Sequence, residues 1–485
     1  MSLKARAIKA VFWSALEQFG NKLVGFIIST MLARLLMPEE FGLIAMLSIF
    51  IGLASVLIDS GLTQSLIRTN ECDTEDLSTV FYFNIIISII VYFIFYLIAP
   101  FVSTYFEQPA LINIIRVYSI VFIINSFSAV QKTILTKSLD FKTLMFATMP
   151  SLFLYGLVGI FLAINGFGVW SLVWAAIAQS IAVSIQLWLK STFKPILIFN
   201  IVKFKYHFNF GYKLLLSGLL ETIFSNSYTF IIGKLYAPSQ VGFYSKSNNL
   251  QMLPVQLITS VLTKITYPLF SEIQNDNIRL KKIFKRLIQI VILIVAPTLV
   301  FSAILATPIF RLLYTEKWLP AVPYFQILCI AGILFPLHSF NLHILNVKGR
   351  SELFLKLEIF KKIIILVAIF ISIQYGLLGL LYGNVITSIL SFFINSYYSG
   401  KFINYNSLHQ IKDMMPILLI TLISGFIVFL TDILINSYHD IIRILVGGFI
   451  GIFSLFVLLA VLKISAYEDF KSIVMLRGFK INKNI

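Results

Sequence analysis

The stretch LLMPEEFG, residues 35–42, lies between two long apolar runs near the start of the chain. Two hundred residues later, LYAPSQVG at 235–242 repeats its first leucine, its proline and its glycine, again between two apolar runs. Alone, this spacing is an ordinary helix–turn–helix corner, in which proline starts a helix and glycine lets two helices approach. Its recurrence in both halves indicates an internal repeat instead. The structural positions of this repeat are Pro38, Gly42, Pro238 and Gly242.

The composition sets the class of protein. Of the 485 residues, 59% are hydrophobic and only 12% are charged, and the mean hydropathy is +0.92. A soluble protein of this length needs far more polar surface. The apolar residues form runs of roughly 20–27, the length of a membrane-spanning helix, and these runs are continuous rather than alternating, which excludes a transmembrane barrel. The sequence therefore predicts an all-α polytopic membrane protein.

The apolar runs predict about fourteen transmembrane helices. They lie near residues 10–36, 39–66, 78–101, 109–135, 142–164, 167–189, 208–235, 239–268, 284–307, 319–346, 354–375, 377–399, 413–435 and 441–463. A shift of 200 residues places the first two spans on the seventh and eighth, which predicts two six-helix lobes in the same membrane orientation, plus two C-terminal helices. The expected domains are an N-terminal lobe at 1–200, a C-terminal lobe at 201–402, and 403–485 with the last two spans and a cytoplasmic tail.

The formal net charge of +17 follows the membrane topology. Lysine and arginine cluster in every second loop, which the positive-inside rule explains without a nucleic-acid partner. The clusters lie at 4–9, 132–142, 190–205, 279–286, 348–362 and 463–483. We therefore expect both termini in the cytoplasm. We expect no disulfide between Cys72 and Cys329, and no cleavable signal peptide, because the first apolar run carries Glu17 and Lys22 and has no small-residue cleavage site.

Polar side chains inside the spans mark the candidate site, because they are costly in hydrocarbon. Glu17 and Asn21 share a helix face, and under the shift of 200 residues this face corresponds to Glu221 and Ser225. We expect the two polar faces to oppose one another across a wet cavity. The candidate residues are Glu17, Asn21, Lys22, Asp59, Glu221, Ser225, Lys246 and Asn249. A role as packing groups between helices stays open for all of them, most of all for Asp59.

No catalytic or metal motif stands out in the sequence. We find no glycine-rich phosphate loop, no zinc-ligand spacing and no nucleophile elbow. His338 and His343 lie five residues apart, so they do not share a helix face, and no carboxylate accompanies them. We interpret them as packing residues, and we expect no metal, no cofactor and no enzymatic activity.

Several segments together resemble a known family. They are LARLLMPEEFGLIAML (32–47), DSGLTQSLIR (59–68), ILTKSLDFK (134–142), GFGVWSLV (166–173), LPVQLITSVLTKITYPLFSEIQND (253–276), EKWLPAVPYFQIL (316–328) and LNVKGRSELFLKLEIFKK (345–362). Over nearly its whole length the chain resembles the Wzx-type polysaccharide flippases, especially their WzxC-like lipopolysaccharide-biosynthesis branch. These proteins belong to the multidrug/oligosaccharidyl-lipid/polysaccharide exporter superfamily, with the lipid II flippases as cousins.

The resemblance implies a fourteen-helix, two-lobe transporter that works by alternating access. Its implied cargo is an undecaprenyl-pyrophosphate-linked oligosaccharide, moved from the cytoplasmic to the outer leaflet of a bacterial inner membrane for cell-surface polysaccharide biosynthesis. The implied partners are this lipid-linked oligosaccharide and the bilayer, with a polysaccharide polymerase and glycosyltransferases as further candidates.

The resemblance also suggests roles for individual residues. In the lipid II flippases, basic residues on the first and eighth helices capture the pyrophosphate, and Lys22 and Lys246 occupy those helices here. The outer half of the second span carries no basic residue, which departs from that pattern. Glu17, Glu221 and Asp59 are candidates for coupling transport to an ion. The last two spans are expected to form a groove for the lipid tail.

Two other functions stay open. A cation-coupled small-molecule exporter of the multidrug type would use Glu17 and Glu221 to bind protons or cationic drugs, whereas Lys22 and Lys246 favour an anionic cargo. A polysaccharide polymerase or O-antigen ligase would need a large extracytoplasmic loop, and the loops predicted on that side are short.

Overall fold

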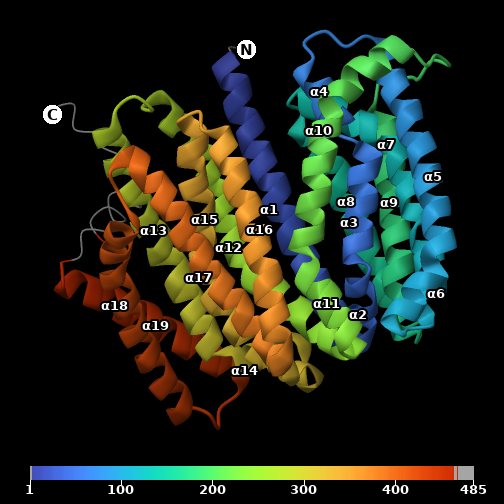
Figure 1. Ribbon diagram of the computed structural model, residues 1–485. Helices are drawn as coiled ribbons and strands as arrows, with labels where there is room; N and C mark the ends of the chain where they lie inside the picture. The colour runs from blue at the N-terminus through green and yellow to red at the C-terminus, as the bar shows by residue number, and fades with distance from the viewer. Residues whose placement is uncertain (1–2, 464–466, 468–485) are drawn as a thin grey trace. The chain divides into compact units, whose positions relative to one another are not determined.

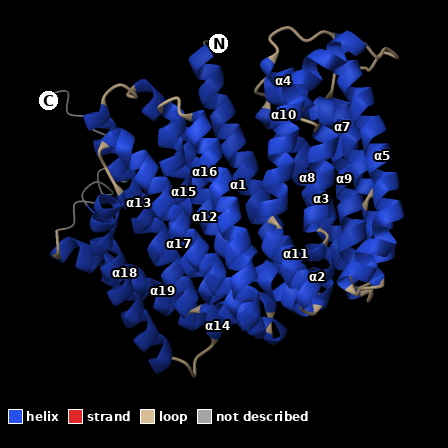
Figure 2. Ribbon diagram, viewed as in Figure 1, coloured by secondary structure: helices blue, strands red, loops and turns tan. Residues whose placement is uncertain are grey.

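The computed structural model describes residues 3–463 and residue 467, and their secondary structure is helical without a strand (Figures 1 and 2). The predicted basic tail residues Lys471, Arg477, Lys480 and Lys483 lie outside the described residues. Contacts within the chain define two compact units, Met1–Ser245 and Lys246–Ile485.

The first unit is a bundle of packed helices. It contains α1 (Leu3–Leu35), α2 (Pro38–Met46), α3 (Ser48–Asp59), α4 (Leu62–Arg68), α5 (Thr74–Phe106), α6 (Ala110–Tyr118), α7 (Ile120–Lys137), α8 (Phe141–Ile164), α9 (Trp170–Lys190), α10 (Ile201–Ser225), α11 (Ser227–Leu235) and the start of α12 (Pro238–Glu272). Helix α1 packs on α8, α8 on α9, α9 on α7 and α7 on α5. Helix α10 packs on α3, α4 and α5 (Figure 1).

The second unit holds the rest of α12 and the C-terminal helices. These are α13 (Asn277–Ile304), α14 (Ala306–Tyr314), the 3-10 helix η1 (Glu316–Ala321), α15 (Val322–Val347), α16 (Ser351–Ser372), η2 (Ile373–Tyr375), α17 (Gly376–Ile403), α18 (Ser407–Leu434) and α19 (Asp440–Val461). Helix α15 packs on α13 and α17, and α18 packs on α13 and α19. The fully buried side chains of Asn341 and Gln410 exchange two amide hydrogen bonds of 3.2 and 3.0 Å, which attach α18 to α15.

The helices agree with the prediction of a multi-pass membrane protein. In the described part of the chain, ten helical segments are long and apolar enough to cross a membrane, or eleven if the bent pair α10–α11 is one span. The segment 351–403 is one of these ten and contains both α16 and α17. Helices α1 and α12 have 33 and 35 residues but are not among the ten. Each predicted run falls on a helix or a broken helix, and fourteen crossings stay a prediction.

Several helices begin at a residue whose side chain caps the exposed backbone N–H groups. Asp73 caps α5 and forms a reciprocal pair with Asp76, in which each carboxylate accepts from the backbone N–H of the other residue, at 2.9 and 3.1 Å. Such a pair satisfies two N–H groups that otherwise lack a partner at a helix start. Side chains of Asp140, Asn200, Asp276 and Asn406 cap α8, α10, α13 and α18.

A break between α3 and α4 lies near the end of the second predicted span. Ser60 and Gly61 have left-handed backbone conformations, with φ of 45° and 68°. Helix α10 passes close to this break, since a Cβ added at Gly61 would lie 2.6 Å from the carbonyl oxygen of Gly211. Only glycine allows the two backbones to come this close. The break leaves Asp59 as the last residue of α3.

The helix boundaries recur at the predicted distance of 200 residues. Helix α1 ends at Leu35 and α2 begins at Pro38, whereas α11 ends at Leu235 and α12 begins at Pro238. The contacts divide the chain differently from the predicted lobes, because α10 and α11 pack on helices of the first unit. The predicted domain boundaries came from sequence similarity rather than from contacts, and they stay a prediction.

Candidate functional site

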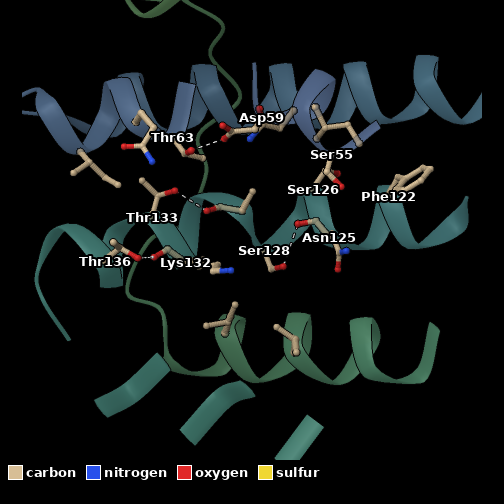
Figure 3. Close-up of a pocket in the computed structure, with 17 residues that line it drawn as sticks. Ser55, Asp59, Thr63, Phe122, Asn125, Ser126, Ser128, Lys132, Thr133 and Thr136 are labelled. Carbon is tan, nitrogen blue, oxygen red and sulfur yellow. Dashed lines mark hydrogen bonds between the residues drawn. The ribbon is translucent and has the colours of Figure 1, made fainter. Parts of the chain in front are cut away.

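A cavity of about 460 Å³ lies in the first unit, between α3, α4, α5, α7 and α9 (Figure 3). Its polar lining residues are Ser55, Asp59, Thr63, Gln64, Asn84, Asn125, Ser126, Ser128, Lys132, Thr133 and Thr136, and its apolar ones are Ile58, Ile67, Phe122, Ala129, Val183 and Leu187. Polar side chains that line a cavity inside a membrane-spanning bundle are costly unless water or a ligand satisfies them. This cavity is therefore the candidate functional site.

The α3–α4 break positions the acidic group of the cavity. Asp59 ends α3, and Thr63, in the first turn of α4, donates a hydrogen bond from its hydroxyl to the Asp59 carboxylate (Figure 3). The bond therefore crosses the interruption at Ser60 and Gly61. Asp59 is partly exposed rather than buried. It is the one predicted candidate residue that lines this cavity.

Helix α7 provides the longest wall. Asn125, Ser128, Lys132 and Thr136 follow one another at intervals of three or four residues, so they share one helix face. Ser128 and Thr136 donate their hydroxyl protons to the backbone oxygens of Asn125 and Lys132, at 3.1 and 2.9 Å. Figure 3 shows the Lys132 side chain among these groups. Lys132 brings a positive charge to a wall that is otherwise neutral.

Asn84, from α5, lines the buried part of the cavity. Its side chain is fully buried, and neither its amide nitrogen nor its oxygen has a hydrogen-bond partner among the described residues. An unpaired buried amide costs about 1–3 kcal/mol, so buried amides in native proteins nearly always have a partner, often ordered water. Asn84 is thus a group that a ligand or water in the cavity would satisfy.

The predicted residues of α1 and α10 lie outside this cavity lining. Asn21 donates from its amide to the Glu17 carboxylate at 2.9 Å and to the hydroxyl of Thr148, on α8, at 3.3 Å. Glu17 and Asn21 therefore share the face that contacts α8, and Lys22 is partly buried beside them. On α10, Glu221 and Ser225 are exposed.

Lys246 belongs to the second unit and is nearly buried there, with 4% of its surface exposed. Its ammonium lies 5.7 Å from the ring centroid of Tyr314 and 6.0 Å from that of Trp318, a geometry that permits cation–π attraction. Asn249, one turn further along α12, is exposed. Lys22 and Lys246 belong to different units, so the cavity that we expect them to share stays a prediction.

The histidines of α15 have packing partners. The hydroxyl of Ser388 donates to the backbone oxygen of Ala331 at 3.1 Å, so the Nε2–H of His338, 3.1 Å away, donates to that hydroxyl oxygen. His343 is close to the ring of Phe340. Within the residues that the structure describes, no group of three or more His, Cys, Asp or Glu gathers as a metal site.

Sequence reasoning missed most of the cavity. It assigned Lys132 to a cytoplasmic loop, although Lys132 lies in the last third of α7 and lines the cavity. The polar spacing of Asn125, Ser128 and Lys132 within a predicted span, continued by Thr136 just after it, was the available signal. The role of Asn84 has no such signal, because the lack of a partner appears only once the helices pack.

More than half of the chain matches a known protein family. The sequence profile of a family described as "Polysaccharide biosynthesis protein" matches residues 31–323. The chain belongs to this family. The match includes the first predicted corner, the whole cavity and the start of the second unit. It confirms the resemblance to the Wzx-type proteins that the sequence segments indicated.

Curated relatives of this family member cover most of its length. An uncharacterized membrane protein in the cps region of Klebsiella pneumoniae is 26% identical over 94% of this chain and 96% of its own length. The lipopolysaccharide biosynthesis protein WzxC of Escherichia coli is 24% identical, covering 81% and 82%. The teichuronic acid biosynthesis protein TuaB of Bacillus subtilis is 25% identical, covering 78% of each chain. WzxC and TuaB are named for different polysaccharides.

Solved structures share the fold at lower sequence identity. The lipid II flippase MurJ, in an inward closed conformation, aligns with a TM-score of 0.78 and 15% identity over 93% of this chain and 99% of its own. An inward-facing multidrug resistance transporter of the MATE family aligns with a TM-score of 0.63 and 17% identity over 81% and 99%. The family member therefore has the helical transporter fold of these proteins.

Proposed function

We propose that the protein is a flippase for an undecaprenyl-pyrophosphate-linked oligosaccharide, which it moves by alternating access from the cytoplasmic to the outer leaflet of a bacterial inner membrane. The product would serve cell-surface polysaccharide biosynthesis. The observation that carries the proposal is the membership of the polysaccharide biosynthesis family, in a chain whose fold matches that of a lipid-precursor flippase over 93% of its length.

The physical need for such a protein is clear. A glycan joined to a pyrophosphate cannot cross hydrocarbon unaided, because its polar groups would lose their hydrogen bonds to water. A flippase must therefore offer polar groups within the membrane. The lining of the cavity in the first unit, with its amides, hydroxyls, Asp59 and Lys132, supports this reading.

Fourteen spans in two six-helix lobes plus two C-terminal helices are part of the proposal. The count follows if α10–α11 is one bent span, α16 and α17 are separate spans, and α1 and α12 also cross the membrane. Polar residues along α1 and α12 lower their hydropathy, and polar residues are expected on helices that line a wet cavity. The recurring corner at Pro38 and Pro238 supports the repeat.

The expected cations for the pyrophosphate are Lys22 on α1 and Lys246 on α12. An ammonium in a partly dehydrated cavity attracts phosphate by several kcal/mol per close pair if the effective dielectric constant is about 20. In the described conformation Lys246 lies against two aromatic rings, so its release toward cargo would accompany the conformational cycle. Glu17, Glu221 and Asp59 are the carboxylates proposed to couple transport to an ion.

The remaining parts of the proposal concern location and partners. Both termini would lie in the cytoplasm, as the distribution of lysine and arginine predicts. Glycosyltransferases would act on the lipid-linked cargo before translocation, and a polysaccharide polymerase would act on it afterwards. A drug exporter of the multidrug type stays the alternative, since its fold is shared.

Reconstitution tests the proposed function directly. Purified protein in liposomes should expose an undecaprenyl-pyrophosphate-linked oligosaccharide to a lectin outside, at a rate that depends on protein content. Lys22→Ala or Lys246→Ala should lower this rate strongly, Lys246→Arg should retain part of it, and Lys234→Ala should match wild type, because Lys234 pairs with Glu107 outside the expected cavity. Export of a cationic dye without movement of the glycolipid would instead identify a drug exporter.

A further inference from the structure

We propose that the cavity in the first unit is a sugar-binding subsite that takes one or two rings of a hydroxyl-rich glycan. The inference rests on the proposed function for the source of the sugar, the glycan of a lipid-linked cargo. The chemistry of the cavity itself is independent of that source, and a free sugar would be recognised in the same way.

The volume and the mixed charge of the cavity favour a neutral polar ligand larger than an ion. Its volume of about 460 Å³ lies within the range of about 300–1,000 Å³ that holds small molecules. A single metal ion would leave most of this space empty. The positive charge of Lys132 would repel a free cation, and the negative charge of Asp59 would repel a pyrophosphate, because like charges repel strongly where the dielectric constant is low. A neutral polar molecule satisfies both groups.

The hydroxyl groups of the lining have already donated their protons. Six of them donate to backbone oxygens or to a carboxylate, which leaves their oxygen lone pairs for other donors. They are Ser55 to Ile51, Thr63 to Asp59, Ser126 to Ile123, Ser128 to Asn125, Thr133 to Ala129 and Thr136 to Lys132. The Ser126 oxygen already accepts from the hydroxyl of Ser88, at 3.0 Å. The other five oxygens and the Asp59 carboxylate are acceptors, which suits a ligand rich in hydroxyl protons.

Amides and an ammonium supply the complementary donors. Asn84 is fully buried beside the cavity with both polar side-chain atoms unpaired among the described residues, so a ligand that reached this amide would satisfy both atoms. One amide can bind two neighbouring sugar hydroxyls, donating to one and accepting from the other. Gln64, Asn125 and Lys132 are exposed and add donors on the accessible side.

The apolar part of the lining fits the carbon face of a sugar ring. Phe122 from α7 and Leu187 from α9 are buried and line the same cavity as the polar groups. Sites for small molecules commonly combine an apolar floor with a few placed polar groups. This combination of donors, acceptors and apolar surface is what sugar recognition requires.

Binding of free sugars to the full-length protein tests the inference. The protein would be held in lipid nanodiscs, because alkyl glycoside detergents would compete. Saturation-transfer difference NMR would then probe D-glucose, D-galactose, N-acetyl-D-glucosamine and N-acetyl-D-galactosamine. We expect transfer to at least one of these sugars. Asn84→Leu and Asn125→Ala should each weaken its apparent affinity about tenfold, the loss expected when one or two hydrogen bonds to a ligand disappear.

The chain offers a matched control for the buried substitution. Asn395, on α17 in the second unit, is also fully buried with both side-chain polar atoms unpaired in the described part of the protein, yet it does not line the cavity. Asn395→Leu should leave sugar binding unchanged. Asn125 is exposed, so Asn125→Ala keeps the test valid even if Asn84→Leu fails to fold.

Several results would overturn the inference. They are no transfer to any of the four sugars, or equal transfer in wild type, Asn84→Leu and Asn125→Ala. Broadening of the ²³Na signal that Asp59→Asn removes, without sugar binding, would assign the cavity to an ion. Glycolipid flipping that Asn84→Leu leaves unchanged would reject the subsite and keep the flippase. Sugar binding without flipping by wild type would reject the flippase and keep the subsite.

Discussion

Gly42 lies against the backbone of Pro238, and Gly242 lies against the backbone of Pro38 in the same way. A Cβ added at Gly42 would overlap the carbonyl oxygen of Pro238, and a Cβ added at Gly242 would overlap that of Pro38. The two copies of the sequence motif therefore pack against each other, each glycine covering the proline that begins the opposite helix. This reciprocal contact, within the first unit, gives the repeated residues a shared structural reason.

Substitution at either corner should destabilise the protein. Gly42→Ala or Gly242→Ala would push the added methyl group into a backbone oxygen, and overpacking of this kind costs about 1–3 kcal/mol. The midpoint of thermal unfolding in detergent, followed by tryptophan fluorescence, would measure the loss. Gly448→Ala is the control, because a Cβ there meets nothing within 4 Å. Equal midpoints for all three variants would contradict the close contact.

Cysteine labelling should place the corner at Pro238 outside the cell. Native Cys72, between α4 and α5, is partly exposed and lies on the side that we predict to be cytoplasmic. In intact cells, Ser239→Cys should react with an impermeant maleimide, whereas Cys72 should react only after permeabilisation. Labelling in the reverse order would invert the topology. Unlike the fold, this orientation rests only on the charges of the loops.

The ion pair between Asp73 and Lys203 should make stability depend on acid pH. The bonded Lys203 ammonium holds the pKa of the Asp73 carboxyl at about 2, below its usual 3.8. A lowered pKa in the folded state stabilises the protein above pH 4, and this contribution disappears as the pH falls from about 4 to 2. The unfolding midpoint of wild type should therefore exceed that of Asp73→Asn above pH 4 and approach it near pH 2.

Asparagine keeps the helix cap at this position, so the comparison isolates the charge. Asp140→Asn is the matched control, because Asp140 caps α8 and accepts from Thr143 rather than from an ammonium. A difference between wild type and Asp73→Asn that persists at pH 2 would show that the ion pair is not its cause. Most of the Asp73 side chain is exposed, so the effect should be small and should fall further at high salt.

His207 should be essential for holding α10 to the first unit. Its ring is fully buried, with Nδ1 2.8 Å from the hydroxyl of Ser65 on α4 and Nε2 3.2 Å from the carboxylate of Asp76 on α5. His207→Phe would fill the space but leave the Ser65 hydroxyl without its partner and remove one of the partners of the Asp76 carboxylate, which keeps Asp73 and Lys203. We expect a cost of about 1–3 kcal/mol. Thermal unfolding would measure this loss. His409→Phe, at an exposed position, should unfold at the same midpoint as wild type. If His207→Phe also unfolded at that midpoint, His207 would not hold α10 to α4 and α5.

The helices were predictable because their sequence signal is continuous. Each apolar run is long enough to span a membrane, and each falls on a helix or a broken helix in the described residues. The breaks were not predictable in the same way. The left-handed backbone at Ser60 and Gly61 depends on α10, which contacts it at Gly211, a residue that lies 150 positions further along the chain.

The candidate site was predictable only in part. Asp59 stands out as a carboxylate within an apolar run, and it lines the cavity. Asn84 does not stand out, because asparagines within spans are commonly paired and only packing reveals that this one has no partner. The aromatic neighbours of Lys246 come from residues about seventy positions away, so the burial of this ammonium could not be read from α12 alone.

The contact between Gly61 and Gly211 also sets an order of events during synthesis. When the ribosome has released α3 and α4 into the membrane, the helix that covers their break has not yet been made. The contact at Gly61 can form only after α10 has been synthesised. A nascent chain that ends near residue 200 would therefore lack the helix that covers this break, so the first unit stays incomplete, and open to membrane chaperones and proteases, from the synthesis of α4 until that of α10.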